Sequence, residues 1–509
     1  MKNQHRIYID SAIVILYTLI SKAVGFVKSM IQASYLGATI ETDAFNVANG
    51  FVGNILYMLS LAIAVSLVPQ YTQHKLQGGE AARKYGTRVT TALMLASVLI
   101  VAFLELVAPV IVRIIAPAYS DDMLSLTIRF FRVLVLGFSF SLGAQIYTNV
   151  LNAERAYGYS SLCSIVNSVV LILFILTLSD TLGVWSLVLS IPVSYFVQWL
   201  VLYIKGRKFA RLSFQFGMRD EAILRLLMIA TPVLISQATV EINQVVDKAL
   251  LTSVDEGALT AVSYAAVLYQ FASTMISAPL SSVMFTELSD AGAKHDCDRI
   301  KLVLNRCYKV ILIICIPVTC VTLLCSSDIV QIVYGHGNYG AAAISNTAIG
   351  LFMYGLCVLP VCIKTVLSRA YYSMNDTKRP MVIGVIEVIC NIFLSILFVK
   401  SYGLAGVVGA TAIASYVAIL IMLIDFNIKH IKVVDKQSIQ TYYKIFLSLL
   451  ICSISAILLS KVTIQSSFLS FGLKTATVMI SHFLFLIIVK ESSTIGIMKF
   501  VAGKLKRYL

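Results

Sequence analysis

Long apolar runs separated by short polar loops make up most of the chain. A membrane-spanning helix needs about 20 apolar residues, because each residue adds about 1.5 Å to its length. No connection is long enough for a separate soluble domain, since the longest, residues 205–225 and 289–309, have only about 20 residues each. The pattern predicts an all-α polytopic membrane protein with about fourteen transmembrane helices. The predicted spans lie near residues 9–35, 44–71, 89–112, 126–151, 159–179, 182–204, 222–250, 259–288, 308–326, 342–368, 381–400, 403–426, 442–461 and 468–489.

The composition agrees with this prediction. Of the 509 residues, 59% are hydrophobic and 13% are charged, with a mean hydropathy of +0.87, whereas a soluble domain has roughly 45–50% apolar and about 25% charged residues. The net charge of +15 does not indicate a nucleic-acid partner, because the basic residues lie in short loops rather than on one soluble face. The ten cysteines lie mostly within apolar runs without a CxxC pair, so we expect neither disulfides nor a metal site.

Loops rich in lysine and arginine alternate regularly along the chain with loops that contain few of either residue. The loops with few basic residues carry acids such as Asp121 and Asp255. Basic loops of membrane proteins face the cytoplasm, so we expect an even number of spans and two cytoplasmic termini. The N-terminal segment has no small-residue cleavage site, which predicts a retained first span rather than a signal peptide. The basic segments lie near residues 2–6, 75–88, 205–219, 294–306, 369–379, 429–436 and 504–507.

The chain repeats itself weakly at an offset of about 220 residues, which is the length of six predicted helices. Residues 42–70 resemble residues 259–287, and a second pair of similar segments has Asn167 and Asn391 at matching places. Six helices per repeat give both copies the same orientation, which predicts two six-helix lobes around an axis along the membrane normal, with the substrate path between them. We expect an N-terminal lobe at residues 1–215, a C-terminal lobe at 216–430, and two further helices with a basic tail at 431–509.

Five cations lie inside the predicted spans: Lys22, Lys28, Arg129, Arg132 and Lys364. A charge near the bilayer centre costs about 2.5–3.5 kcal/mol on insertion scales, so such residues face a cavity or extend to the interface. Arg129 is near a helix end and could extend to the interface, but Lys22 is too far into its span to do so. A cavity lined by cations favours an anion, and lysine is a good point-charge partner for phosphate. We therefore interpret these five residues as candidate substrate ligands.

The embedded acids lie largely in the second half of the chain, and Glu105 is an exception. Oxygen atoms from two or three helices could hold a sodium ion or a proton, whereas a hydrogen-bonded packing cluster explains the same residues without an ion. Both interpretations stay open. The candidate residues for a coupling ion are Glu241, Asp247, Glu387, Asn391, Thr411 and Ser415.

Four segments carry a family resemblance: SKAVGFVKSMIQASYLGATIETDAFNVA, LNAERAYGYSSLCSIVN, YGHGNYGAAAISNTAIGLFMYGLCV and YYSMNDTKRPMVIGVIEVICNIFL. They resemble the MurJ (MviN) lipid II flippases of the multidrug/oligosaccharidyl-lipid/polysaccharide exporter superfamily. The resemblance covers roughly the first 430 residues. It implies a flippase in the bacterial plasma membrane, which carries undecaprenyl-pyrophosphate-linked disaccharide-pentapeptide from the inner to the outer leaflet by alternating access.

The resemblance also implies roles for single residues. Lys22 and Lys28 occupy the positions of two cavity arginines of the family. Asp43 matches an aspartate at the mouth of the second span, and it is a further candidate substrate ligand. The chain departs from the family pattern at Val267, where an arginine is expected, and at Gln270, where a glutamate is expected. Lysine keeps the charge of arginine but lacks its bidentate geometry. These departures keep a related polyprenyl-pyrophosphate glycan open as the substrate.

The leading interpretation is therefore a lipid II flippase and not an enzyme. One alternative is a flippase for another polyprenyl-pyrophosphate-linked oligosaccharide, such as an exopolysaccharide, O-antigen or teichoic-type unit. An ion-coupled drug exporter would need an acidic cavity, and a membrane glycosyltransferase would need catalytic acids on a larger outer loop. The expected partners are the lipid-linked glycan pyrophosphate and membrane lipids, without nucleic acid. We expect no cofactor beyond a coupling Na⁺ or proton.

Overall fold

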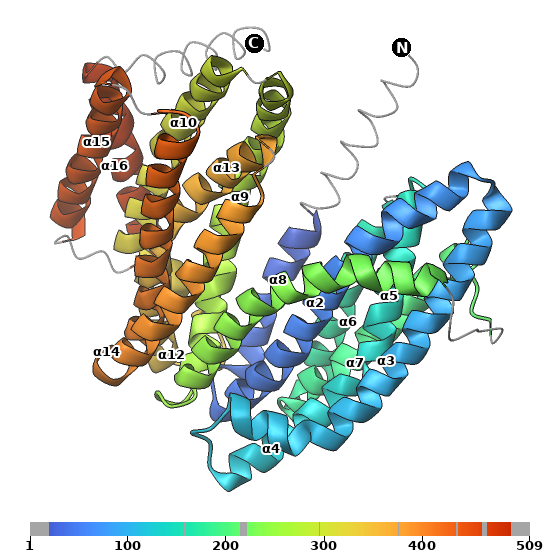
Figure 1. Cartoon of the computed structure of the whole chain (residues 1–509). Coiled ribbons are helices and arrows are strands. Elements are labelled where there is room, and N and C mark those ends of the chain that lie inside the picture. Colours follow the sequence, from blue (N-terminus) through green and yellow to red (C-terminus); the bar gives the residue numbers. More distant parts are fainter. Residues whose placement is uncertain are drawn as a thin grey trace, which may run out of the picture. The chain divides into compact units, whose positions relative to one another are not determined.

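Helices form the described part of the chain, which contains no β-strand, as the all-α prediction requires (Figure 1). The structure is a computed structural model that describes residues 20–156, 158–213, 221–294, 296–374, 376–433, 436–460 and 466–489. A helix over residues 20–36 comes first. It is followed by α2 (Ile40–Leu76), α3 (Gly79–Ile115), α4 (Asp121–Leu136), α5 (Phe138–Ala153), α6 (Gly158–Leu182), α7 (Trp185–Gly206), α8 (Glu221–Leu251), α9 (Ala258–Ala293), α10 (Cys297–Leu324), α11 (Ser326–Tyr334), α12 (Ala341–Gly355), α13 (Val358–Ser373), α14 (Lys378–Lys429), α15 (Lys436–Ser460) and α16 (Ser467–Ile488).

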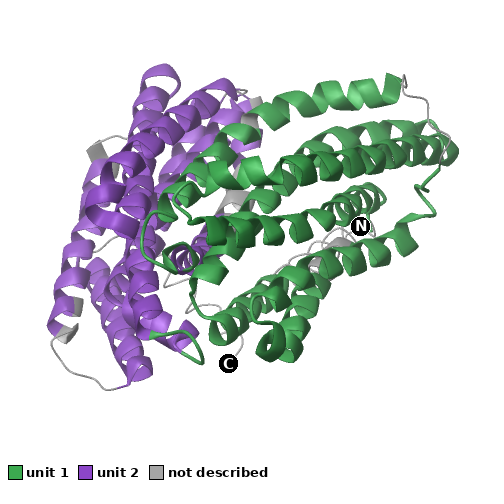
Figure 2. Cartoon of the chain, turned by 90° about the horizontal axis from the view of Figure 1, so that it is seen from below, with its two compact units in different colours: residues 1–260, 336–340 green, residues 261–335, 341–509 purple. Residues whose placement is uncertain are grey.

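The chain divides into two compact units (Figure 2). Unit 1 comprises Met1–Thr260 and His336–Gly340, and unit 2 comprises Ala261–Gly335 and Ala341–Leu509. Helix α8 packs against α2 within unit 1, although the sequence assigns it to the second lobe. The predicted lobes were defined by the sequence repeat, whereas the two units are defined by contacts between residues. The units therefore do not test the lobe boundaries, which stay predictions.

The described helices make the chain a multi-pass membrane protein. Nine of them are long and apolar enough to cross a membrane, or up to eleven if each of two bent pairs counts as one span. The bends are 41° within α8 and 41° between α12 and α13. The predicted number of fourteen spans stays a prediction, because much of the first predicted span, residues 9–19, lies outside the described residues.

Helix α2 shows how local sequence sets a helix end. Thr39 is its N-cap, and the Thr39 side chain accepts a hydrogen bond from the Thr42 N–H (3.3 Å) while the Thr39 N–H donates to the Thr42 hydroxyl (2.8 Å). This reciprocal capping satisfies two backbone donors that have no partner within the helix. Glu41 and Asp43 in the first turn and Lys75 in the last turn oppose the partial charges of the helix ends.

The internal repeat recurs in the order of the helices and in their breaks. Helices α4 and α5 meet at Gly137, and α12 and α13 meet about 220 residues later at Cys357. Gly183 ends α6 with φ 54°, and Gly403 interrupts α14 with φ 53°. Glycine adopts positive φ with little strain because it has no Cβ. The 52-residue helix α14 is thus two helices joined at a glycine, as the two predicted spans 381–400 and 403–426 require.

The two glycines correct one detail of the repeat. Asn167 and Glu387 each lie 16 residues before their glycine, so Asn167 corresponds to Glu387 rather than to Asn391. The side-chain contacts agree with this pairing. The Asn167 amide donates to Ser194 Oγ at 3.0 Å, and the Ser415 hydroxyl donates to Glu387 Oε1 at 3.2 Å. A neutral hydrogen bond in the first half therefore corresponds to one that involves a carboxylate in the second half.

Buried polar contacts fix the last two helices on unit 2. His482 of α16 is fully buried, and its ring nitrogens lie 2.9 Å from Ser448 Oγ of α15 and 3.0 Å from the Ile313 carbonyl of α10. Lys474 of α16 pairs with Asp328 of α11 at 2.7 Å. Apolar side chains of α10, α15 and α16 pack around these contacts. The two C-terminal helices are thus docked on α10 and α11 by burial and by satisfied polar groups.

Candidate substrate and ion sites

Lys22 and Lys28 lie on the first described helix, residues 20–36, in unit 1. Lys22 is exposed and Lys28 is half-buried. The described residues include no ion-pair partner for either ammonium group. An unpaired cation on a membrane helix is costly unless water or an anion reaches it. The two lysines therefore remain available to an anionic ligand.

Arg129 and Arg132 share an exposed face of α4. The Arg132 Nε lies 3.7 Å from Glu105 Oε2 of α3, with 52% of the arginine side chain exposed. A pair at this distance and exposure contributes little to stability, and it offsets part of the arginine charge. The isolated acid Glu105 thus has a partner on the neighbouring helix.

Asp43 is buried, with 5% of its surface exposed, and its carboxylate binds the N-terminus of α9. Oδ2 accepts a hydrogen bond from the Gly257 N–H (2.7 Å), and Oδ1 accepts bonds from the Thr260 N–H (2.7 Å) and hydroxyl (2.6 Å). These amides are among the donors that a helix start leaves without intrahelical partners, and a negative charge there is favourable. The structure gives Asp43 this capping role, and its role as a substrate ligand stays a prediction.

Three segments of unit 1 meet next to this cap, and we call their meeting point the outer junction. They are residues 34–39, which include the end of the first described helix, 255–257 and 336–340. The Asn338 N–H donates to the Ser34 carbonyl at 2.7 Å, and the Asn338 amide donates to the Tyr35 carbonyl at 2.7 Å. A Cβ on Gly257 would lie 2.5 Å from the Ala38 carbonyl oxygen, and one on Gly337 would lie 2.3 Å from the Ser34 oxygen. Glycine is required at both places, because the backbones approach closely and φ is positive.

Tyr119 lies close to the same cap. Its hydroxyl is buried and has no hydrogen-bond partner in the described part of the chain. Burial, and then the charge of Asp43, raise the pKa of the Tyr119 phenol above its ordinary value. The hydroxyl therefore stays protonated. The junction was not predicted from the sequence, although the glycine-rich segment YGHGNYG signals one of its loops.

Four predicted coupling-ion residues come together in unit 2, and we call this group, with Lys364, the Lys364 cluster. The Lys364 Nζ of α13 lies 2.7 Å from Glu387 Oε1 and 2.8 Å from Oε2. Ser415 donates to the same carboxylate. The Asn391 amide donates to Thr411 Oγ1 at 2.9 Å. A predicted substrate ligand and a predicted ion ligand therefore form one ion pair.

The other two predicted ion ligands lie on α8 in unit 1. Glu241 is buried, and its Oε2 has no hydrogen-bond partner among the described residues. Asp247 accepts a hydrogen bond from the Asn243 amide at 3.5 Å. The next residue, Lys248, is a cation that the sequence analysis missed. A Cβ on Gly50 of α2 would lie 2.2 Å from its Nζ, so the facing glycine makes room for the ammonium group.

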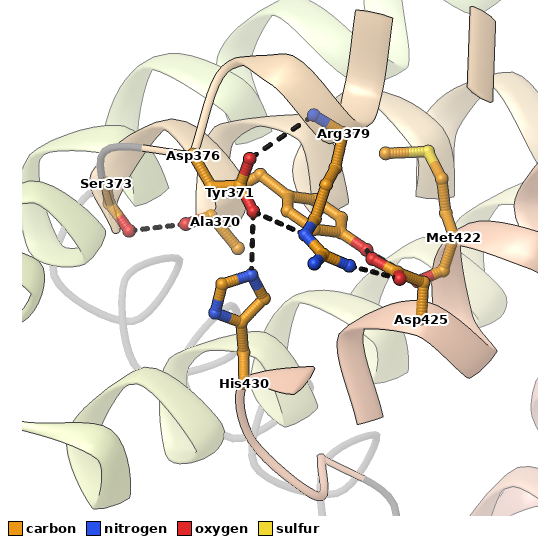
Figure 3. A network of polar contacts seen from close by, with 8 residues as sticks. All are labelled: Ala370, Tyr371, Ser373, Asp376, Arg379, Met422, Asp425 and His430. Carbon is orange, nitrogen blue, oxygen red and sulfur yellow. Dashed lines mark hydrogen bonds and ion pairs between the residues drawn. The ribbon is translucent and has the colours of Figure 1, made fainter. Parts of the chain in front are cut away.

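Asp376 and Arg379, at the start of α14, belong to a polar network (Figure 3). Asp376 lies 2.9 Å from the Arg379 Nε and 3.1 Å from the His430 ring. Arg379 also pairs with Asp425, whose second oxygen lies 2.9 Å from the Tyr371 hydroxyl. This Asp376 network connects the end of α13 with both ends of α14. Because its charges satisfy one another, we assign it a structural role.

Two grooves accompany these groups. One of about 400 Å³ in unit 1 is lined by α2, α5 and α7 and exposes the polar side chains of Ser60, Ser141 and Gln145. The other, of about 390 Å³ in unit 2, lies among α10, α13, α14 and α15 and is almost wholly apolar. Its lining includes Leu312, Leu423, Tyr443 and Phe446. The chain thus offers a surface for polar groups and, separately, one for a hydrocarbon chain.

The long apolar helices in the described part of the chain define a multi-pass helical membrane protein. Residues 32–479 match the family model described as "Lipid II flippase MurJ", and the chain belongs to this family. The family is one of transporters rather than catalysts.

Relatives with this name cover most of the chain. The chain is 24% identical over 452 residues to the probable lipid II flippase MurJ of Rickettsia prowazekii, which covers 87% of this chain and 88% of that protein. It is 28% identical over 412 residues to the probable lipid II flippase MurJ of Rhizobium tropici, with 78% and 77% covered. It is 22% identical over 403 residues to the lipid II flippase MurJ of Burkholderia cenocepacia, with 77% and 78% covered.

Solved structures share the fold. A lipid II flippase MurJ in an inward closed conformation matches with a TM-score of 0.81 at 22% identity, covering 94% of this chain and 99% of the other. An inward-facing multidrug resistance MATE transporter of the MOP superfamily matches with a TM-score of 0.66 at 12% identity, covering 82% and 97%. These likenesses agree with the predicted superfamily.

Proposed function

We propose that this member of the lipid II flippase family moves lipid II across the membrane, from the inner to the outer leaflet, by alternating access. Lysines 22 and 28 bind the pyrophosphate. The observation that carries the proposal is that both ammonium groups lie on one helix, residues 20–36, without an ion-pair partner among the described residues. The sequence predicts this helix as part of the first membrane span. In a low-dielectric surrounding, such charges favour a multivalent anion.

The substrate has three chemically distinct parts, and the chain offers surfaces of the matching kinds. The pyrophosphate needs cations, the glycan and peptide need hydrogen-bonding groups, and the polyprenyl chain needs an apolar surface. The polar groove on α2, α5 and α7 suits the second part. The apolar groove on α10, α13, α14 and α15 suits the third, because burying apolar surface stabilises by about 25 cal/mol per Å².

The outer junction is the element that alternating access would break. It is held by hydrogen-bonded contacts, including those from Gly257 and Thr260 to Asp43. Such a contact can open at a cost of a few kcal/mol. Fourteen spans, two cytoplasmic termini and a plasma-membrane location complete the proposal, supported by the alternation of basic and acidic loops.

The alternative substrates are less well supported. A flippase for another polyprenyl-pyrophosphate-linked oligosaccharide would use the same cations. Val267 and Gln270 stand where the family pattern has arginine and glutamate, and this departure kept such a substrate open. The family match over residues 32–479 favours lipid II. A drug exporter for cationic compounds would need acids in place of Lys22 and Lys28.

Complementation of a bacterium depleted of its own lipid II flippase tests the proposal. Wild-type protein should restore growth and prevent lipid-linked precursor from accumulating. Lys22→Met or Lys28→Met should each lower rescue at least about tenfold, since losing one close charge contact costs more than about 1.4 kcal/mol. Protein in the membrane fraction is quantified in parallel.

Two control variants separate charge from misfolding. Lys28→Arg keeps the charge and should rescue. Lys84→Met removes an exposed lysine that pairs with Glu80 along α3, and it should also rescue. Full rescue by both Lys22→Met and Lys28→Met would refute the pyrophosphate role. If well-expressed wild-type protein failed to restore growth, this result would favour another lipid-linked oligosaccharide as the substrate.

A further inference from the structure

Helices α2 and α8 of unit 1 carry three polar side chains that have no partner in the described part of the chain: Asn54, Glu241 and Lys248. Nδ2 of Asn54 and Oε2 of Glu241 are buried and form no hydrogen bond there. Lys248 is half-buried and forms neither a hydrogen bond nor an ion pair with a described residue. Buried polar groups of proteins nearly always have a hydrogen-bond partner. Three unsatisfied groups on one pair of helices therefore need an explanation.

Contacts between the two helices show that these groups face one another. Helix α8 packs against α2, and Gly50 of α2 lies so close to Lys248 that a Cβ would overlap the ammonium group. Asn54 follows Gly50 by four residues, which keeps it on the face of α2 that meets α8. Glu241 precedes Lys248 by seven residues, which likewise keeps it on the face of α8 that meets α2. The start of α2 contacts the loop after α8 through Asp43, so the helices run antiparallel and Asn54 lies on the Glu241 side of Lys248.

The two charged groups have opposite signs and are kept apart. Seven residues of helix separate their Cα atoms by about 10.5 Å along the axis, and Lys248 packs on Gly50 rather than on Glu241. An unpaired charge within a membrane helix is unfavourable, so each group needs a counter-charge. A simple anion near Lys248 would be repelled by Glu241, and a simple cation near Glu241 would be repelled by Lys248. A ligand that carries both an ammonium group and a carboxylate satisfies the two residues together.

We propose that these three residues bind the peptide of the substrate. Glu241 binds an ammonium group of the peptide, and Lys248 and the Asn54 amide bind a carboxylate. Ammonium and carboxylate groups form strong, charge-assisted hydrogen bonds with such partners. The inference rests on the proposed function, in which the cargo carries a peptide, and it names the side chains that recognise this part.

The assignment leaves the sugars to a different surface of unit 1. The groove on α2, α5 and α7 has no charged side chain among the described residues that line it, and neutral hydroxyl and amide groups suit such a lining. A lipid-linked glycan without a peptide would leave Glu241 and Lys248 without counter-charges. The two residues therefore select for a cargo that carries charged amino-acid groups.

Three lipids that differ by one charged group test the inference without a measurement of transport. They are lipid II with a lysine in its peptide, the same lipid with the lysine side-chain amine acetylated, and the same lipid with the C-terminal carboxylate amidated. The full chain in detergent is mixed with each lipid, and native mass spectrometry measures the fraction of protein that carries one lipid. Wild-type protein should bind each modified lipid at least about tenfold more weakly than lipid II, because one close charge contact is lost.

Single substitutions assign the contacts. Glu241→Gln should abolish the discrimination against the acetylated amine and keep the discrimination against the amidated carboxylate. Lys248→Met should do the reverse. Asn54→Leu should weaken binding of both lipids that keep the carboxylate at least about threefold, because a hydrogen bond to a charged acceptor is lost. A purely structural role of these residues would instead change the affinities for all three lipids by the same factor.

Two control variants remove charges of the same kind elsewhere in unit 1. Glu221→Gln removes an exposed acid from the first turn of α8, and Lys84→Met removes an exposed lysine of α3. Both should discriminate among the lipids as wild-type protein does.

The wild-type comparison needs no substitution, so it decides the inference even if a variant does not fold. Equal binding of all three lipids by wild-type protein would overturn the inference and leave the proposed function in place. An absence of binding to lipid II would overturn both. The inference would also be wrong if Glu241→Gln and Lys248→Met each weakened the binding of all three lipids equally.

Discussion

The cap that Asp43 provides for α9 allows a quantitative prediction. In Asp43→Asn the side chain keeps its shape but loses its charge and one of its acceptor oxygens. Oδ1 can still accept from Thr260, whereas an NH₂ group then faces the Gly257 N–H, which bonds to Oδ2 at 2.7 Å in the wild type. Losing one hydrogen bond to a charged acceptor costs about 1.5–3 kcal/mol, and losing the charge at the helix N-terminus costs about 0.3–1 kcal/mol more.

The expected loss is therefore about 2–4 kcal/mol in the free energy that holds the outer junction closed. Hydrogen–deuterium exchange measures this quantity directly, because an amide exchanges only when its hydrogen bond opens. Peptides that contain Gly257 and Thr260 should exchange about 30- to 700-fold faster, since each 1.4 kcal/mol is a factor of ten.

A matched control exists in the same turn. Glu41 is an exposed acid in the first turn of α2, and Glu41→Gln should leave this exchange within about threefold of wild type, because exposed charges near a helix end contribute only about 0.3–1 kcal/mol. If Asp43→Asn behaved like Glu41→Gln, the carboxylate would not be holding α9, and the junction would depend on its glycine contacts instead.

Three further substitutions test other parts of the structure by thermal unfolding of the purified chain. Gly183→Ala should destabilise by about 1–2 kcal/mol through positive φ alone, because a Cβ there meets nothing within 4 Å; Gly79→Ala, also in open space, should not. Arg379→Lys should destabilise by about 1–2 kcal/mol, because lysine cannot serve Asp376 and Asp425 together, whereas Lys378→Arg on the exposed neighbour should be neutral. Gly50→Ala should displace the Lys248 ammonium group and so change the unfolding midpoint. Adding Lys248→Met should relieve this change. An unchanged midpoint in Gly183→Ala, in Arg379→Lys or in Gly50→Ala would refute the corresponding argument.

Hydrophobic length predicted the class of the protein, a multi-pass helical membrane protein. Loop charge predicted its orientation, which stays a prediction. The backbone N–H and C=O groups of an apolar run that crosses a membrane find hydrogen-bond partners only in a helix or a closed barrel. The local sequence therefore determines the element. The repeat was also visible, because both halves keep the same helix order and the same breaks. Gly183 and Gly403 both have a positive φ, which glycine adopts with little strain. The two glycines therefore mark corresponding places in both halves.

The roles of the charged residues were less predictable. The sequence identified Lys364 and Glu387 as embedded charges, but it assigned one to the substrate and the other to an ion. It described Asp43 as a residue at the mouth of a span, although the carboxylate caps another helix. It missed Lys248, which follows two acids in an apolar run and lies against Gly50.

The sequence by itself determined that long apolar segments form membrane helices, and it predicted the embedded charges and the repeat of the two halves. These are properties of single segments, since burial in lipid depends on local length and polarity. Only the tertiary structure decided which charge meets which partner. Lys364 and Glu387 are 23 positions apart, and Asp43 and Gly257 are 214 positions apart. Electrostatic energy depends on distances of a few ångströms between side chains of different helices, and those distances exist only once the helices have packed.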